Sequence, residues 1–314
     1  MTASTSSEQV ETVGNGRLPS AGSSIEEVAL APSADIAADA VTLPGARRST
    51  RWPRRRRALG LVVPAALLGA WWLCSARGII SIKLLPAPWD VAEAAWDFAA
   101  GTRVDSLAGV VPFSGAASEH LSASILRWLS GYGLAVGVGL TVGLGIGLSR
   151  LVADLVDPLV QAVRAIPIFA WLPLALVWFG LGEGAARYLV FIGAVSPILI
   201  ATADSVSRVP AAYVETALML GTPRRSLARR VYVPAALPGI VTGLRLGLTL
   251  GWMSVIVGEL TGTQTGIGAM MNAAREGGRL DQILVGMLCF ALVGLLGDTV
   301  LRAATRPFVA WSDR

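Results

Sequence analysis

The residues that could carry out chemistry are few and far apart in this sequence. His120 is the sole histidine, so a histidine-based metal site or a serine–histidine relay could use that one position alone. It precedes an amphipathic stretch, and we interpret it as a plain surface or interface residue. Cys74 and Cys289 lie in separate apolar runs and are expected to be small core residues rather than a disulfide or a metal pair.

The sequence contains no nucleotide-binding motif built on glycine and lysine. A Walker A loop requires Gly-Lys followed by Ser or Thr, and the single lysine, Lys83, follows Ile82. We therefore expect that the chain itself binds no ATP through a P-loop, holds no cofactor or metal and is not an enzyme. The scarcity of histidine and the lack of a nucleophile–base constellation argue against a membrane-bound enzyme as well.

The segment 204–234 holds the most informative polar residues, including Glu215 and five arginines. Two short amphipathic helices are predicted in it, at about 211–220 and 223–230. They are joined near Gly221, because glycine suits a helix C-cap and Thr222-Pro223 suits the start of the next helix. An apolar edge in such a helix–turn–helix has no lipid to face, so it must pack on its own chain or dock into a partner groove.

The composition places these residues in a membrane protein. Hydrophobic residues make up 54% of the chain and charged residues 15%, whereas soluble globular proteins carry about 25% charged residues. Charges are costly in a bilayer, which explains the deficit. The net charge of +5 could suggest a nucleic-acid partner, but arginines in cytoplasmic loops account for it, and we expect none.

Apolar segments long enough to cross a bilayer as helices lie at about 58–76, 128–148, 165–182, 186–203, 236–258 and 282–301. Nineteen helical residues reach ~28 Å, which spans the hydrocarbon core with little tilt. The predicted fold class is therefore an all-α polytopic membrane protein with about six transmembrane helices. Prolines interrupt several spans, and neighbouring helices can satisfy the carbonyls that they free.

Arginine content predicts the orientation and the division of the chain. An arginine-rich block precedes the first span, and arginines are in excess in the segments on the same side, so we expect a cytoplasmic N-terminus. The predicted parts are a disordered cytoplasmic tail at 1–50, an arginine-rich flank with the first span at 51–78, an external segment with an interfacial helix at 79–127, a core transmembrane domain at 128–308 that contains the loop 204–234, and a C-terminal tail at 309–314.

Glycines recur at intervals of four in the second predicted span, at Gly139, Gly143 and Gly147. Small residues spaced in this way lie on one face of a helix and let another helix approach closely. A dinucleotide-binding or phosphate-loop interpretation fails, because no GxGxxG fits in register and no strand precedes these glycines. We therefore interpret them as helix-packing residues.

Charged residues in or near the spans have simple interpretations. Glu183 and Glu259 stand at the outer ends of spans and are expected to be interfacial. Asp298 and Arg302 are spaced i,i+4 and should form a helix-surface ion pair. Arg245 falls ~16 Å into the fifth span if that helix starts at the interface. It is either a functional intramembrane arginine or one that reaches the cytosolic level, and the sequence leaves both open.

The segment 204–234 resembles the cytoplasmic-loop signature of ABC importer permeases. That signature is Glu-Ala-Ala, three residues, Gly, nine residues and Ile-x-Leu-Pro. This chain has its counterparts in register, with conservative departures at the second, fifth and sixth of these positions: Glu215, Thr216, Ala217, Gly221, Val231, Val233 and Pro234. The resemblance covers roughly 79–308. Within it, the sequence is similar to the sulfonate/taurine/nitrate branch of the family at 84–91, 124–127, 165–182 and 234–245.

The resemblance implies a type I ABC importer permease fold whose cytoplasmic coupling helices insert into an ATPase subunit dimer. ATP and Mg would be bound by that partner, and an extracytoplasmic solute-binding protein would deliver the solute. A homodimer in the bacterial cytoplasmic (inner) membrane is expected, surrounded by the lipid bilayer. The solute would be a small anion such as an aliphatic sulfonate, taurine or nitrate.

Residues of the translocation path are harder to predict. The candidates are Pro167, Pro173 and Trp178, at the interrupted third span, and Arg245. The alternative function is a gradient-driven secondary transporter or channel. Such proteins usually carry ionisable residues in mid-span, and the first, second and sixth spans hold almost none.

Overall fold

The protein is all-helical over the residues that the computed structural model describes, 54–78, 85–101, 113–260 and 262–309. The chain divides into two units, Met1–Gly60 and Leu61–Arg314, and the helical bundle belongs to the second. The predicted tail at 1–50 lies outside the described residues, as do all but the first residue of the tail at 309–314. The all-α fold class predicted from the sequence is confirmed.

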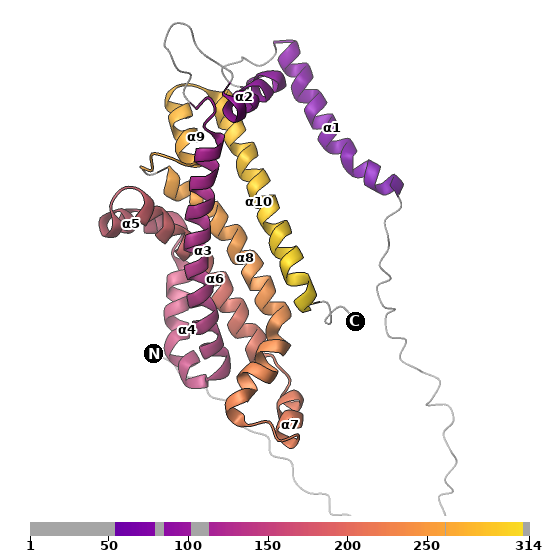
Figure 1. Cartoon of the computed structure of the whole chain (residues 1–314), viewed down its shortest axis with the longest axis vertical. Helices are drawn as coiled ribbons and strands as arrows, with labels where there is room; N and C mark the ends of the chain where they lie inside the picture. The colour runs from indigo at the N-terminus through magenta and orange to yellow at the C-terminus, as the bar shows by residue number, and fades with distance from the viewer. Residues whose placement is uncertain (1–53, 79–84, 102–112, 261, 310–314) are drawn as a thin grey trace, which may run out of the picture. The chain divides into compact units, whose positions relative to one another are not determined.

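The elements follow one another as a series of long and short helices (Figure 1). Their bounds are α1 (Arg54–Ala76), α2 (Pro88–Ala100), α3 (Ala117–Leu148), α4 (Arg150–Ala165), the 3₁₀ turn η1 (Ile168–Trp171), α5 (Leu172–Phe179), α6 (Glu183–Ser207), α7 (Ala211–Met219), the 3₁₀ turn η2 (Arg224–Ser226), the π-helical turn η3 (Ala228–Tyr232), α8 (Val233–Glu259), α9 (Ile267–Glu276) and α10 (Leu280–Val309).

The predicted count of six spans is not exact. Among the described residues, four helices are long and apolar enough to cross a membrane: α3, α6, the continuous stretch of η3 and α8, and α10. A fifth crossing is possible if the bent pair of 150–165 and 168–179 counts as one span. The first predicted span is helical, and its apolar part, Val62–Ala76, is shorter than these four.

The third predicted span, 165–182, is not one straight helix. The chain bends by 96° between α4 and the helical stretch that ends with α5. Ile166 precedes Pro167 and is extended, with ψ 118°, because a proline ring disfavours the helical conformation of the residue before it. Pro173 then stands in the first turn of α5, where its missing N–H costs no helical hydrogen bond.

In the segment predicted to be external, 79–127, the described residues are more helical and more buried than the sequence predicts. The helix expected at 88–98 is present as α2, which buries Val91, Ala94 and Phe98 in the largest apolar cluster and exposes Trp89 and Trp96. α3 begins at Ala117, eleven residues before the predicted span. Its 32 residues measure ~48 Å, so the helix is longer than the ~30 Å hydrocarbon core is thick.

α6 is the central helix, with α3 on one side and α8 on the other (Figure 1). Glycines of both neighbours face it. On α3, a Cβ at Gly139, Gly143 or Gly147 would come within 2.6–2.8 Å of Ile198, Leu199 or Val206. On α8, a Cβ at Gly243, Gly247 or Gly258 would come within 2.5–2.6 Å of Ala201, Ile198 or Ala186. The three helices therefore meet at backbone distance, which is how helices associate in lipid.

We expect Gly143→Ala to destabilise the protein. The new methyl group would meet the Leu199 carbonyl oxygen at 2.7 Å and Thr202 at 2.8 Å. Overpacking of this kind costs ~1–3 kcal/mol. Gly137→Ala is the matched control, since nothing lies within 4 Å of its Cβ position on the same helix. Thermal unfolding in detergent should show a lower Tm for Gly143→Ala and an equal or higher Tm for Gly137→Ala. Equal losses at both positions would refute the packing argument.

Candidate functional site

The loop between α6 and α8 lies at one end of the bundle, opposite α2 and α9 (Figure 1). α7 contains no buried residue, and its large apolar side chains point outward. Tyr213, Met219 and Leu220 are 58%, 87% and 82% exposed. Glu215 is exposed too, and among the described residues it has no ion-pair partner. α7 therefore presents an apolar surface with one carboxylate, Glu215, that the rest of the described chain leaves uncovered.

Gly221 has a conformational reason to be glycine. It ends α7 with φ +81°, a left-handed conformation that side chains disfavour. Its N–H donates to the Leu218 carbonyl, and the Thr222 N–H donates to the Ala217 carbonyl, both at 2.9 Å. These two bonds form a Schellman cap. The spacing between the Glu215 group and Gly221 thus sets the length of α7 and the direction in which the chain leaves it.

The prediction of a separate second helix in this loop, at 223–230, is wrong. The chain forms the 3₁₀ turn η2 and then the π-helical turn η3, which runs directly into α8. Pro234 has no N–H to donate to the Arg230 carbonyl, so a regular α-helical ladder cannot run through this point. A single π turn is a usual way to absorb such a break. Val231 and Val233 are half-buried on this turn, and Pro234 is exposed.

A cavity of about 730 Å³ lies beside α6. Its walls come from the break between α4 and η1, from α6 and from α8. Most of the lining side chains are aliphatic or aromatic. The residues are Val163, Arg164, Ile166, Pro167, Ile168, Phe169, Ile192, Gly193, Ser196, Pro197, Ile200, Ala201, Asp204, Leu246, Leu250, Met253, Ser254 and Val257. Along α6 the lining runs from residue 192 to residue 204, which is ~18 Å.

The four path candidates from the sequence lie in different places. Pro167 lines the cavity, whereas Pro173, Trp178 and Arg245 are not among its lining residues. Pro173 begins α5. Trp178 is 57% exposed and belongs to an aromatic group with Phe179 and Tyr188. The structure therefore brings one of the four to the cavity.

Arg245 is held by an ion pair between two helices. Its Nε donates to Asp298 of α10 at 2.9 Å, and Arg302 donates to the other oxygen of the same carboxylate at 2.9 Å. The helix-surface pair predicted between Asp298 and Arg302 is confirmed, but Arg245 joins it. Asp298 thus ties α8 to α10.

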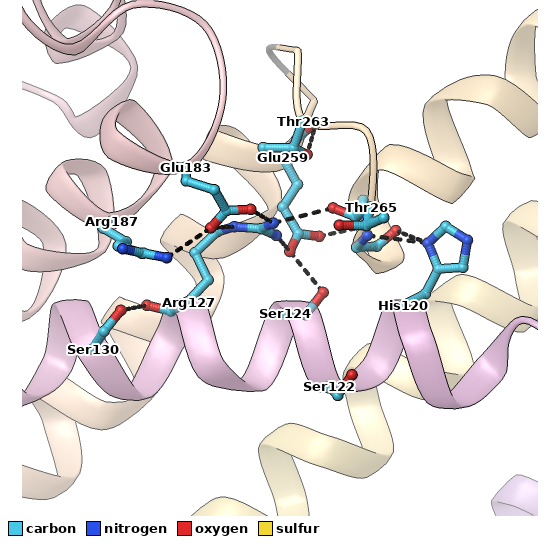
Figure 2. Close-up of polar contacts among 12 residues, drawn as sticks. His120, Ser122, Ser124, Arg127, Ser130, Glu183, Arg187, Glu259, Thr263 and Thr265 are labelled. Atoms are coloured by element: carbon cyan, nitrogen blue, oxygen red, sulfur yellow. Dashed lines mark hydrogen bonds and ion pairs between the residues drawn. The ribbon is translucent and has the colours of Figure 1, made fainter.

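A buried polar network joins α3, α6, α8 and α9 at the other end of the bundle (Figure 2). The Arg127 guanidinium pairs with Glu259 and with Glu183, and it donates to the Thr265 carbonyl at 3.2 Å. Arg127 and Glu259 are each 1% exposed. Ser124 Oγ donates to Glu259 at 2.6 Å.

Backbone groups complete the network. The Gly268 N–H donates to Glu259 at 2.7 Å, and the Ile267 N–H donates to Ser124 Oγ at 2.9 Å. The Gly266 N–H donates to His120 Nδ1 at 3.0 Å. Side chains of α3 and α8 thereby satisfy the N–H groups at the start of α9, which a helix N-terminus leaves without internal partners.

Two interpretations from the sequence are corrected here. His120 is 7% exposed and hydrogen-bonded, not a plain surface residue, and Glu259 is fully buried rather than interfacial. The Arg127 partner of Glu259 and the Gly266 partner of His120 lie more than 130 residues away in sequence, so no local pattern indicated them. One signal was available: His120, Ser124 and Arg127 are spaced i, i+4 and i+7, which places three polar side chains on one helix face.

Comparison with known proteins identifies the family. Residues 135–310 match the family described as binding-protein-dependent transport system inner membrane component. The chain belongs to this family. It is therefore a membrane permease, as the resemblance of the 204–234 loop implied.

Its relatives carry related names. The taurine transport system permease protein TauC of Escherichia coli (strain K12) is 33% identical over 84% of this chain and 94% of its own length. The aliphatic sulfonates permease protein SsuC of Bacillus subtilis (strain 168) is 31% identical over 88% and 94%. A solved methionine ABC transporter, MetNI in inward-facing conformations, aligns with a TM-score of 0.49 and 20% identity over 59% of this chain and 94% of that chain.

We expect Glu259→Ala to be strongly destabilising, because it leaves the Arg127 charge buried with one partner fewer. Breaking a buried pair on one side costs ~3–5 kcal/mol. Thermal unfolding of the purified protein measures the loss. Adding Arg127→Met to Glu259→Ala should restore part of it, and Glu276→Ala, an exposed control, should change little. A double variant less stable than Glu259→Ala alone would contradict this account.

Proposed function

We propose that this chain is the permease subunit of an ABC-type importer that moves a small solute across the bacterial cytoplasmic membrane. The observation that carries the proposal is the exposed helix α7, capped at Gly221, at one end of a permease bundle. ATP hydrolysis in a separate subunit drives transport, and ATP and Mg are bound there. This chain supplies the path of the solute through the membrane, and its helices are moved by the conformational change of the ATPase.

The coupling surface of this proposal consists of Tyr213, Glu215, Met219 and Leu220. An apolar tip beside a carboxylate suits insertion of a short amphipathic helix into a groove of the ATPase dimer. The two ends of the 204–234 loop continue into α6 and α8, which line the cavity. A displacement of α7 is therefore passed to both cavity walls by helices that pack rigidly on each other.

The solute path in this proposal runs along the cavity beside α6. Pro167 stands at the break between α4 and η1, and Pro197 removes one backbone hydrogen bond from α6, so the helices there can change their arrangement. A second copy of the chain completes the path as a homodimer. The N-terminus is cytoplasmic on the side of α7, and an extracytoplasmic solute-binding protein docks at the other end.

The solute class follows from chemistry that the relatives share. Those relatives are named for taurine, aliphatic sulfonates and bicarbonate. Each of these solutes carries an oxyanion. We infer that the solute is a small anion of this kind, such as an aliphatic sulfonate, taurine or nitrate.

Glu215→Lys tests the coupling surface. Reversing a charge at a docking surface places like charges together or leaves a partner unpaired, and we expect at least ~10-fold less co-purified ATPase and matching loss of ATP-driven uptake. Affinity purification of tagged protein from native membranes, with mass spectrometry of what accompanies it, gives the readout. Size-exclusion chromatography verifies that the variant is folded.

Glu276→Lys is the matched control. It makes the same change at an exposed glutamate of α9, at the opposite end of the bundle (Figure 1). Recovery of the ATPase should be unchanged in it. A Glu215→Lys protein that retains its ATPase and normal uptake would remove the coupling assignment. A wild-type chain that repeatedly purifies without any ATPase would overturn the importer function itself.

A further inference from the structure

The cavity beside α6 contains a cation with no counter-ion. Arg164, in the last turn of α4, and Asp204, near the end of α6, both line it. Asp204 accepts from Arg208 Nε at 2.8 Å. Arg164 has no ion-pair partner among the residues that the structure describes. By contrast, Arg127 of α3 and Arg245 of α8 are paired with carboxylates.

A hydroxyl group that lines the same cavity has no hydrogen-bond partner among the described residues. In α6 and α8, the hydroxyls of Thr202, Ser205, Thr242, Thr249 and Ser254 each donate to the carbonyl four residues earlier. Ser196 lines the cavity and makes no such bond to any described residue. Serine in a helix usually satisfies its hydroxyl in that way, so the Ser196 hydroxyl is left to donate into the cavity.

Proline adds an acceptor nearby. Pro197 lies inside α6 and has no N–H, so the Gly193 carbonyl loses its helical hydrogen-bond donor. Gly193 is itself a lining residue. The cavity thus offers the Arg164 guanidinium, the Ser196 hydroxyl and the Gly193 carbonyl among mostly aliphatic walls, and its lining carboxylate, Asp204, is paired with Arg208. Apolar walls with a few converging polar groups are typical of sites for small organic molecules.

We propose that this cavity binds a small organic oxyanion, with its sulfonate-like or carboxylate-like group against Arg164 and its alkyl part on the aliphatic wall. Ser196 donates a hydrogen bond to the bound solute. The inference deepens the proposed import function and rests on it. Aliphatic walls favour an alkyl oxyanion over an inorganic one such as nitrate, because they gain from burial of the alkyl part.

A charge-selective labelling experiment tests this site without requiring transport. Ser196→Cys is introduced into a chain whose native thiols are removed by Cys74→Ala and Cys289→Ala. The purified full-length protein in lipid nanodiscs is then treated with two methanethiosulfonates of similar size. One carries a 2-sulfonatoethyl group and the other a 2-(trimethylammonium)ethyl group. The ratio of the two rates, each divided by its rate with a free thiol, reports the charge at the cavity.

Arg164 should make the anionic reagent the faster one. Arg164→Gln removes an attraction for one reagent and a repulsion for the other, so the ratio should fall by about tenfold. Arg164→Lys should keep most of the preference. Arg150→Gln is the control, because it removes an exposed arginine from the first turn of the same helix, ~21 Å from Arg164, and it should leave the ratio unchanged.

Protection experiments identify the ligand class. Ethanesulfonate should slow labelling of the Ser196→Cys thiol by neutral N-ethylmaleimide several-fold more than nitrate does at equal ionic strength. Equal protection by the two would overturn the preference for an organic oxyanion. A ratio that does not respond to Arg164→Gln would overturn the anion site, as would a thiol that neither reagent reaches. A lipid phosphate paired with Arg164 would also give that unresponsive ratio.

The experiments distinguish failure of the anion site from failure of the proposed importer function. If the wild-type chain recovers an ATPase but Arg164 has no effect on labelling, the importer assignment stands and the anion site fails. If labelling depends on Arg164 but no ATPase is recovered, the site stands as a solute site of a different kind of transporter.

Discussion

The backbone contact of α3 and α8 with α6 is the constraint on which the rest of the structure depends. Helices in lipid gain little from apolar surface alone, so they must pack closely to associate. Glycines such as Gly143 and Gly247 allow this on the two sides of α6. Because α6 is fixed in this way, the groups it carries are fixed too, from Glu183 at its start to Asp204 before the α7 loop.

Two sets of ion pairs hold helices of the bundle together, whereas Arg164 has no ion-pair partner among the described residues. Arg127 ties α3 to α6 and α8, and Asp298 ties α8 to α10. A charge buried without a partner would be too costly to keep, so both are paired. Arg164 stands apart, since it lines a cavity where a solute or water can reach it. This difference separates structural arginines from a candidate solute-binding one.

The proposed coupling loop and the cavity share the same two helices. α6 ends shortly before α7, and η3 passes into α8 without an interruption. Gly221 fixes where α7 stops, while Pro234 makes the return into α8 a π turn. Pro167 stands at the break between α4 and η1, and Pro197 lies within α6, next to the glycine contacts of α3 and α8. A rigid connection with local breaks is what a motion passed from a cytoplasmic partner to a solute path requires.

Local physics let the sequence determine much of this protein by itself. Long apolar runs predicted the helices of the bundle, α2 and α7 were correctly expected as short helices, and the glycine cap at Gly221 followed from spacing alone. Each depends on hydropathy or on residues within a turn of one another. The 96° bend after α4, the π turn and the early start of α3 were missed. Only the tertiary structure decided which charges meet, because the Arg127–Glu259 pair and the cavity around Ser196 join residues from distant parts of the chain, whose proximity is set by packing and not by sequence order.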